Sequence, residues 1–288
     1  MSGDNCILVT GASGRTGRAV ISALNKKGAY VRAFIRRADV VDDIKLLGAA
    51  EILLGDLFET ESLAAAVSGC SQVIHICPPM NQGEAELAKT VTDLCLSFDV
   101  RRLVLYSVLH PLLSDVRHHH LKLQAEEYLV NSGQVYTILQ PGRYMQHHVQ
   151  IWKEIIETGK HRMPFNINAK FNIVDVADLA EAVARVLTEE GHEAATYQLA
   201  GPHSLSQIDM ARIISEVTGK VISAEFKPFD ELRSDAEKKG MSADRIQQLY
   251  LMNKHYDNHG LVGNPNILEW LLDRPPTDFA TYIRNFLA

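Results

Sequence analysis

The sequence predicts an α/β protein, with a doubly wound parallel sheet and a smaller C-terminal α+β lobe. Apolar segments of strand length alternate with amphipathic helical segments up to residue 139. The strand segments are near-continuous apolar runs, which is typical of parallel strands that helices cover on both faces. A turn with three glycines joins the first strand to the first helix, and a second strand follows, which is the order of a βαβ unit.

The first strand is predicted over residues 6–10, and the glycine turn follows it directly. Gly11 lets the chain turn sharply, Gly14 removes a Cβ where a pyrophosphate would approach, and Gly17 lets the helix pack close to the sheet. The N–H groups and the dipole at the start of that helix favour a phosphate. This context predicts a dinucleotide-binding Rossmann fold rather than a glycine-rich turn without a ligand. Further side chains expected in the phosphate site are Ser13, Arg15 and Thr16.

The end of the second strand, predicted over residues 30–35, indicates which dinucleotide binds. NAD sites usually place an acid there, whereas NADP sites place an arginine near the 2′-phosphate. Arg36 and Arg37 stand at this point, and the nearest acid in the sequence is Asp39. Because a guanidinium fork matches a phosphate, we expect NADP(H). The alternative is that these arginines are solvated surface charge.

Further strands are predicted over residues 50–54, 72–77, 102–106 and 134–139, with helices over 61–68, 83–99 and 115–131. Prolines stop two of these strands, because proline cannot continue a sheet ladder. Ligands of such sheets bind beyond the carboxyl ends of the strands. One crevice should therefore bring together the residues that follow each strand: the turn at 11–17, Arg36, Asp56 and Leu57, Cys77 to Pro79, Ser107, and residues 140–144.

The C-terminal half has weaker periodicity. It predicts helices over 148–158, 175–189 and 204–218, a strand over 196–199, and short helices and loops to the end. We expect residues 1–155 to form the dinucleotide-binding domain, with 173–200 returning to it. Residues 201–288, with 156–172, should form the smaller substrate lobe, because substrate pockets often lie between lobes.

Composition excludes several classes of protein. The formal net charge is −6 and no long basic run occurs, so neither nucleic acid nor an anionic membrane is an expected partner. No apolar run reaches transmembrane length, and the N-terminus has no basic segment of a secretory signal. The four cysteines lack CxxC spacing, which favours reduced thiols in a cytoplasmic protein.

The chain resembles the NmrA-like group of atypical short-chain dehydrogenase/reductases. The resemblance covers most of the chain and rests on nine motifs: VTGASGRTG at 9–17, VRAFIRR at 31–37, GDL at 55–57, CPP at 77–79, LYSVLHP at 105–111, HHHLKLQAEEYL at 118–129, YTILQPGRYMQ at 136–146, DVADLAEA at 175–182 and YQLAGPHSLS at 197–206.

This resemblance implies NADP(H) on the first domain and a small-molecule substrate under the C-terminal lobe. Asp56 and Leu57 would bracket the adenine, and Lys122 would reach the nicotinamide ribose. The resemblance also places two segments along the cofactor: Cys77, Pro78 and Pro79 on one side, and Pro141 to Tyr144 at the nicotinamide.

One departure from the family of dehydrogenases concerns the proton donor. Typical members use Tyr-x-x-x-Lys, but the residue four before Lys122 is His118. A histidine can donate a proton near neutral pH, so His118 or the adjacent His119 is a candidate acid. Ser107, at a strand end, would polarise a carbonyl. No metal is expected, because adjacent histidines on a helix point in different directions.

Three functions remain open. The leading one is an NADPH-dependent reductase of a small, largely apolar carbonyl, quinone, imine or enone, and the retained Lys122 favours it. The second is an NADP(H)-sensing regulatory protein without turnover, which would bind a protein partner and which the missing tyrosine favours. The third is a non-redox enzyme of secondary metabolism that retains NADP(H) in its pocket.

Overall fold

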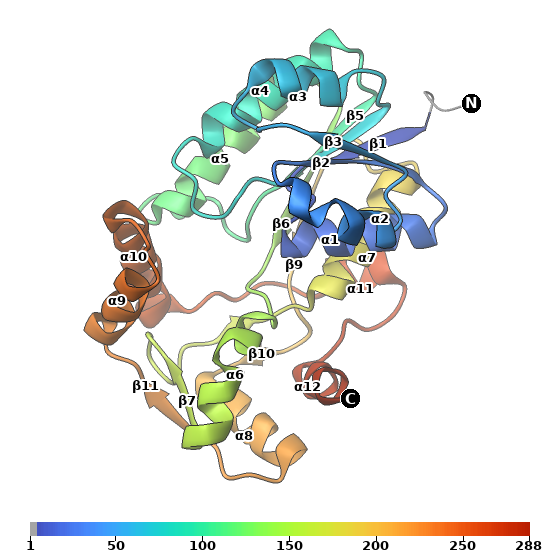
Figure 1. Cartoon of the computed structure of the whole chain (residues 1–288). Helices are drawn as coiled ribbons and strands as arrows, with labels where there is room; N and C mark the ends of the chain where they lie inside the picture. Colours follow the sequence, from blue (N-terminus) through green and yellow to red (C-terminus); the bar gives the residue numbers. More distant parts are fainter. Residues whose placement is uncertain (1–4) are drawn as a thin grey trace. The chain divides into compact units, whose positions relative to one another are not determined.

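A seven-stranded sheet in the order β3-β2-β1-β4-β5-β6-β9 organises the first part of the chain (Figure 1). The computed structural model describes residues 5–288. The strands are β1 (Cys6–Val9), β2 (Tyr30–Ile35), β3 (Glu51–Leu54), β4 (Gln72–His75), β5 (Arg102–Tyr106), β6 (Tyr136–Pro141) and β9 (Ala195–Leu199). The strand pairs from β3 to β6 are all parallel, and the strand order reverses between β1 and β4. The predicted doubly wound Rossmann sheet is confirmed.

Helices cover both faces of this sheet (Figure 1). They are α1 (Arg15–Lys26), α2 (Val41–Leu46), α3 (Thr60–Val67), α4 (Glu84–Ser97), α5 (Arg117–Asn131) and α7 (Val176–Thr188). One core cluster joins residues of α3, α4 and α5 to the strands, while α1, α2 and α7 lie on the opposite face. Because both faces are covered, β1, β4 and β5 are buried along their whole length. The short α2 follows a 3-10 turn (Ala38–Val40) in a polar stretch where no helix was predicted.

The chain forms two units. Unit 1 consists of Met1–Leu112, Leu121–Gln140 and Leu179–Tyr197, and it holds most of the sheet. Unit 2 consists of Leu113–His120, Pro141–Asp178 and Gln198–Ala288. Part of the segment expected to return to the first domain, Leu179–Tyr197, therefore belongs to unit 1.

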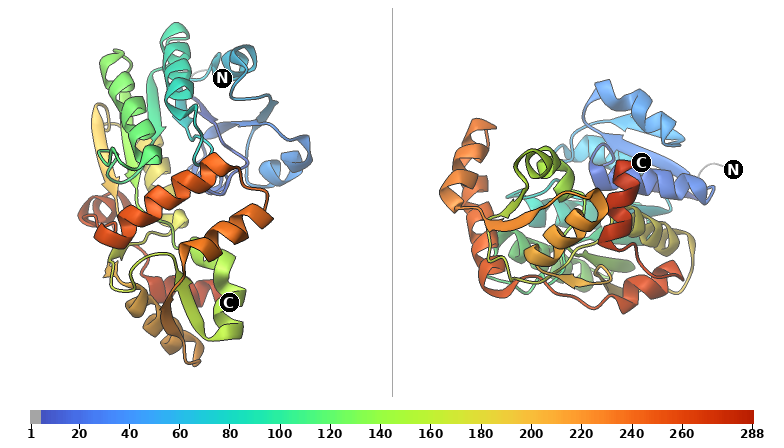
Figure 2. Two further views of the ribbon diagram at one scale, coloured as in Figure 1. Left: turned by 90° about the vertical axis from the view of Figure 1, so that its left-hand side faces the viewer. Right: turned by 90° about the horizontal axis from the view of Figure 1, so that it is seen from below.

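Unit 2 is built from short strands and helices. Its strands pair in twos, β10 (Ser204–Leu205) with β8 (Phe171–Asn172) and β11 (Ser223–Phe226) with β7 (Lys160–Met163). Its helices are α6 (His147–Thr158), α8 (Gln207–Thr218), α9 (Phe229–Lys238), α10 (Ala243–His259), α11 (Asn266–Leu272) and α12 (Phe279–Leu287). α9 packs beside α10, and α12 beside α8 (Figure 2).

The start of α8 differs from the sequence prediction. The predicted helix began at Ser204, but residues Ser204–Leu205 form a strand and the helix begins at Gln207. Ser206 is the capping residue, and it forms a reciprocal capping box with Asp209. Ile208 is 44% exposed, although its spacing from Ala211 and Ile214 predicts that these residues share one buried apolar face.

Two histidines lie in the core of unit 2. The rings of His148 on α6 and His161 on β7 stack with centroids 5.2 Å apart, and Phe279 of α12 packs on His148 at 4.7 Å. Burial lowers the pKa of His161 to about 4 and also lowers the pKa of His148. Both imidazoles are therefore neutral near pH 7.

Acid should destabilise the protein through this pair. The pKa of an unfolded histidine is about 6.5, so between that pH and about 4 the unfolded chain binds a proton that folded His161 does not. His161 alone should lower the free energy of unfolding by about 3 kcal/mol as the pH drops through this range, and this contribution should be level above pH 6.5. Urea unfolding of the wild type and of His161→Gln at pH 7.5, 5.5 and 4.5 measures this, and equal pH slopes in both would contradict it.

The cysteines Cys6, Cys70, Cys77 and Cys95 are free and buried. The thiols of Cys6 and Cys70 form a hydrogen bond with their sulfur atoms 2.8 Å apart. The side chains therefore pack as small apolar groups of the core, as the apolar runs around most of them predict.

Candidate functional site

The three glycines of the turn have different surroundings in unit 1. Gly11 has a φ of +60°, and a Cβ there would lie 2.4 Å from the carbonyl oxygen of Ile76. A Cβ at Gly17 would lie 2.4 Å from the carbonyl oxygen of Gly11. The fold itself therefore requires these two glycines.

Gly14 is different, because it is exposed and a Cβ there would meet a single atom within 4 Å, the carbonyl oxygen of Gly11 at 3.2 Å. Gly14 is the N-cap of α1, and no side chain caps this helix. The N–H groups of the first turn thus face an open approach, which suits an anion. Near this turn Ser13 is half-buried and Thr16 is buried, while Arg15 is exposed.

Basic side chains flank the turn. Arg18, in the first turn of α1, donates to the carbonyl oxygen of Ser13 at 3.1 Å and pairs with Asp43 at 3.2 Å, so it braces the loop. Arg36 directly follows β2, and its side chain is 74% exposed. Its acidic neighbour is Asp56, 3.9 Å away, whereas Asp39 pairs with Arg37 at 3.4 Å. Asp39 is the acid closest to Arg36 in the sequence, but in the structure Asp39 pairs with Arg37.

The segments after β3 and β4 contain the other predicted cofactor contacts. Asp56 and Leu57 are both half-buried, and the Asp56 carboxylate accepts a hydrogen bond from the Phe58 N–H at 3.0 Å. Pro78 and Pro79 are exposed, whereas Cys77 is 9% exposed. Burial raises the pKa of the Cys77 thiol to about 12, so the thiol stays protonated and neutral near pH 7.

Lys122 takes part in a buried ion pair. Its side chain on α5 is 7% exposed and pairs with Glu84, the first residue of α4, whose side chain is 3% exposed. The ammonium also donates to the carbonyl oxygen of Tyr106, at the end of β5, at 2.8 Å. Lys122 is thereby fixed at the carboxyl end of the central strands. The sequence did not indicate a role for Glu84. An acid in the first turn of a helix is ordinarily exposed to solvent and interacts favourably with the helix dipole.

A second buried polar pair lies at the ends of β1 and β4. The Thr10 hydroxyl lies 3.0 Å from Nδ1 of His75, and it accepts a hydrogen bond from the Ile76 N–H at 3.0 Å. Burial lowers the pKa of His75 to about 3, and the charge of Lys122 acts in the same direction. The imidazole is therefore neutral and orients the strand ends.

Ser107, predicted as a catalytic residue, belongs to a third buried network. Its hydroxyl forms a short hydrogen bond with the carboxyl group of Glu126, one turn after Lys122 on α5. The side-chain amide of Gln140 donates to both oxygens of Glu126, at 3.0 and 2.9 Å. Burial raises the pKa of Glu126, while the hydrogen bonds from Ser107 and Gln140 act against this. Ser107 is thus joined to a buried carboxyl group that no sequence motif indicated.

The remaining predicted residues belong to unit 2. His118 is half-buried, and His119 is fully buried with Nε2 3.3 Å from the Tyr256 hydroxyl. Pro141 is buried, and Tyr144 is half-buried with its ring stacked on His147 at 5.6 Å. Within residues 5–288 no group of three histidine, cysteine or acidic side chains could hold a metal ion.

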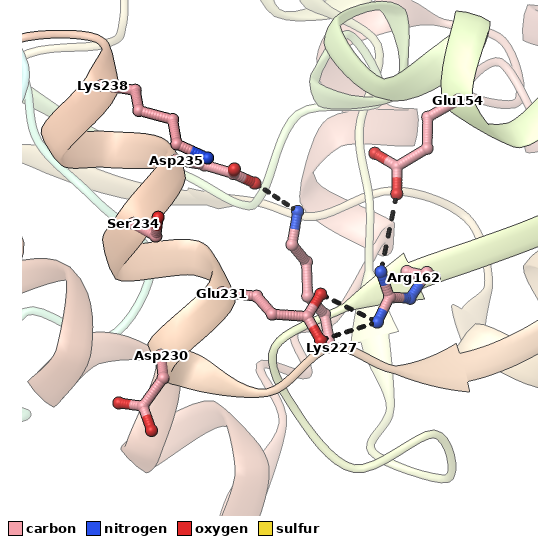
Figure 3. Close-up of a pocket in the computed structure, with 8 residues that line it drawn as sticks. All are labelled: Glu154, Arg162, Lys227, Asp230, Glu231, Ser234, Asp235 and Lys238. Carbon is pink, nitrogen blue, oxygen red and sulfur yellow. Dashed lines mark hydrogen bonds and ion pairs between the residues drawn. The ribbon is translucent and has the colours of Figure 1, made fainter.

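A charged surface cavity of about 570 Å³ lies elsewhere in unit 2, between α6, β7 and α9 (Figure 3). Two of its cations are paired: Arg162 lies between Glu154 and Glu231, 4.0 and 3.0 Å away, and Lys227 pairs with Asp235 at 2.8 Å. The acidic side chains of the lining outnumber the basic ones, so this cavity offers no excess positive charge for an anionic ligand.

Comparison with known proteins covers almost the whole chain. The family model described as the NmrA-like family matches residues 3–284. An NAD(P)H azoreductase from Xenophilus azovorans is 25% identical over 98% of both chains. The structure of an NADPH-dependent quinone oxidoreductase from Escherichia coli complexed with NADPH superposes with a TM-score of 0.86, at 23% identity over 98% of this chain and all of that one. A Citrobacter sp. triphenylmethane reductase complexed with NADP(H) gives a TM-score of 0.86, at 24% identity over 97% and 99%.

Proposed function

Because the chain belongs to the NmrA-like family, we propose that it is an NADPH-dependent reductase of a carbonyl, quinone, imine or enone. The observation that carries the proposal is the open turn at Gly14, with the exposed Arg36 at the end of β2. The relatives named azoreductase, quinone oxidoreductase and triphenylmethane reductase support reduction by a nicotinamide cofactor.

The residues present fit NADPH. The uncapped start of α1 and the open side of Gly14 suit the pyrophosphate, with Ser13, Arg15 and Thr16 around it. Arg36 would hold the 2′-phosphate, and Asp56 with Leu57 would bracket the adenine. Cys77, Pro78, Pro79, Pro141 and Tyr144 would line the rest of the cofactor, and Lys122 the nicotinamide ribose. When bound, NADPH supplies the hydride for such a reduction.

Reduction of a polar double bond also needs a proton, and the Ser107–Glu126 pair is our proposed source. In the structure the Ser107 hydroxyl donates to the Glu126 carboxyl group. In the proposed relay the hydroxyl donates instead to the substrate atom that gains the electron pair, and a protonated Glu126 replaces the proton on the Ser107 oxygen. Gln140 holds the carboxyl group in place. His118, four residues before Lys122, is the alternative proton donor.

Arg36 should set the preference between the two dinucleotides. In Arg36→Glu the carboxylate would repel the 2′-phosphate, so NADPH affinity should fall about 100-fold, or about 3 kcal/mol, while NADH affinity changes less than threefold. Arg37→Glu is the matched control, because Arg37 already pairs with Asp39. Fluorescence titration with both dinucleotides measures the effect. Equal losses for NADPH and NADH, or wild-type preference for NADH, would refute the role of Arg36.

A dinucleotide-sensing regulator is the second candidate, and the histidine at position 118 favours it, since a typical dehydrogenase has its tyrosine acid there. It predicts NADPH binding without turnover and a protein partner that binds in a cofactor-dependent way.

The third candidate, a non-redox enzyme of secondary metabolism, predicts product formation without net cofactor consumption. Loss of NADPH absorbance across a panel of quinones, imines, enones and azo dyes separates these outcomes: turnover supports the reductase, and no turnover with any class despite tight binding refutes it.

We also propose a cytoplasmic location and no nucleic-acid partner. The four free, buried cysteines support the location. The net charge of −6 and the absence of a long basic run support the lack of a nucleic-acid partner. Within residues 5–288 none of the helices has the length and apolar character needed to cross a membrane.

A further inference from the structure

The guanidinium group of Arg143, in unit 2, lies over two aromatic rings. Its guanidinium carbon lies 5.5 Å from the ring centroid of Phe165 and 6.0 Å from that of Phe171, and both rings are buried. Tyr256 packs edge-on against Phe171 at 5.6 Å, and His119 is hydrogen-bonded to Tyr256. We call these five residues the Arg143 site. Arg143 itself is half-buried, so a ligand can reach it.

The backbone holds Arg143 firmly. Its carbonyl oxygen accepts a hydrogen bond from the Val174 N–H at 2.8 Å, and the neighbouring Gly142 and Met145 N–H groups donate to Leu199 and Val174, each at 2.9 Å. The residue is therefore pre-positioned, two residues beyond the end of β6. Ligands of this fold class bind beyond the carboxyl ends of the strands.

The charge of Arg143 is not neutralised by any part of the chain that the structure describes. Arg32 and Arg102 are mostly buried too, but they pair with Glu51 at 2.7 Å and with Glu193 at 3.3 Å. For Arg143 no ion pair or hydrogen bond of the guanidinium occurs among residues 5–288. The ionisable group that favours its charge is Tyr256, and burial raises the pKa of that phenol to about 12, so it is neutral.

Arginine stays protonated in proteins, so the half-buried guanidinium of Arg143 keeps its charge without an anion beside it in the described part of the chain. The aromatic faces stabilise the cation but use none of its five N–H donors, so these remain available to a ligand. The nearby His148 and His161 are neutral because burial lowers the pKa of both, so neither adds a second positive charge beside Arg143. One fork-shaped cation in aromatic surroundings matches a monovalent, planar carboxylate better than a phosphate with nearly two charges.

We propose that Arg143 binds a carboxylate carried by the substrate, while the buried aromatic rings of the Arg143 site hold the guanidinium in place. This inference rests on the proposed reductase function, and it narrows the substrate class to molecules that carry a carboxylate.

Binding of benzoate tests the site without turnover. Calorimetry should show benzoate binding to the full-length wild type, at least tenfold weaker binding to Arg143→Met, and no binding of benzamide, the neutral isostere. Arg162→Met is the control, because Arg162 is a paired surface arginine, and it should bind benzoate as the wild type does. Arg143→Lys keeps the positive charge but loses the forked guanidinium, so it should bind benzoate with an affinity between those of the wild type and Arg143→Met. It serves as a second variant in case Arg143→Met does not fold. Equal benzoate affinity in the wild type and Arg143→Met, or binding of benzamide as strong as benzoate, would overturn the proposal.

A substrate pair then links the site to the reaction. A carboxylated naphthoquinone and its methyl ester should differ at least 30-fold in kcat/KM with the wild type, and less than threefold with Arg143→Met. NADPH oxidation with an unchanged acid-to-ester ratio in Arg143→Met would overturn the inference and leave the reductase function standing. Benzoate binding that depends on Arg143, together with no NADPH oxidation by either quinone, would uphold the anion site and refute the reductase function.

Discussion

Glu84→Gln should lower the free energy of unfolding by about 3–5 kcal/mol, since it leaves the buried ammonium of Lys122 without its carboxylate. Both side chains are nearly inaccessible to water, at 7% and 3% exposure, so solvent cannot replace the lost partner. Lys122→Met should cost a similar amount, because it leaves the Glu84 carboxylate buried alone. The double variant Glu84→Leu/Lys122→Met should recover most of the loss, since it removes both charges together.

Urea unfolding followed by circular dichroism measures these free energies. The matched control on the same helix is Glu86→Gln, which breaks the Glu86–Lys89 pair; those side chains are 77% and 37% exposed. It should change the free energy of unfolding by less than about 1 kcal/mol. A loss below about 1 kcal/mol for Glu84→Gln would show that the ion pair does not hold Lys122 in place.

Glu126→Gln should lower kcat about 100-fold or more, since it removes the proposed proton source while keeping a hydrogen-bonding group beside Ser107. NADPH affinity should stay within about threefold of wild type, because the proposal gives Glu126 no cofactor contact. Ser107→Ala should lose a similar amount, and the double variant little more, because both residues act in one relay. Glu127→Gln is the control, since Glu127 is the exposed neighbour on the same helix.

The pH profile gives a second readout of this relay. Burial raises the pKa of Glu126, so its protonated form persists to higher pH than that of an exposed glutamate. The wild-type kcat should therefore fall as the pH rises through this raised pKa, and the fall should be absent in Glu126→Gln. A wild-type kcat in Glu126→Gln, or the same pH profile in both proteins, would assign the proton to another donor such as His118.

The sheet was predictable because its signals are local. Apolar runs such as residues 72–75 and 102–106 must be buried on both faces, and the turn at Gly11 and Gly17 has a backbone that other residues do not fit. The wrong helix assignments lie where the local sequence pattern fits both a helix and another structure, so that packing decides between them. α2 was missed because the acidic and basic residues around it made the stretch look like a loop. The helix α8 begins three residues later than predicted because Ser204 pairs with Asn172 in a short strand.

Single motifs indicate only part of the candidate site. The glycine turn, Arg36, Ser107 and Lys122 were each identified at a strand end or in a family motif. Glu84 and Glu126 were not, because their meaning depends on partners 38 and 19 residues away that the fold brings beside them. Arg143 was within a recognised motif, but only the contacts show that its charge has no acidic partner while other buried arginines have one.

Hydride transfer is the central claim, and a labelled cofactor tests it most directly. The protein should be incubated with NADPH carrying deuterium at C4, in separate experiments for each face of the ring, and with an enone and an imine, whose reduced carbon atoms keep the label. We expect one of the two labelled forms to pass its deuterium to the reduction product, with one NADPH consumed for each product formed. Tight NADPH binding with no deuterium in any product, or product formed without NADPH consumption, would contradict the account.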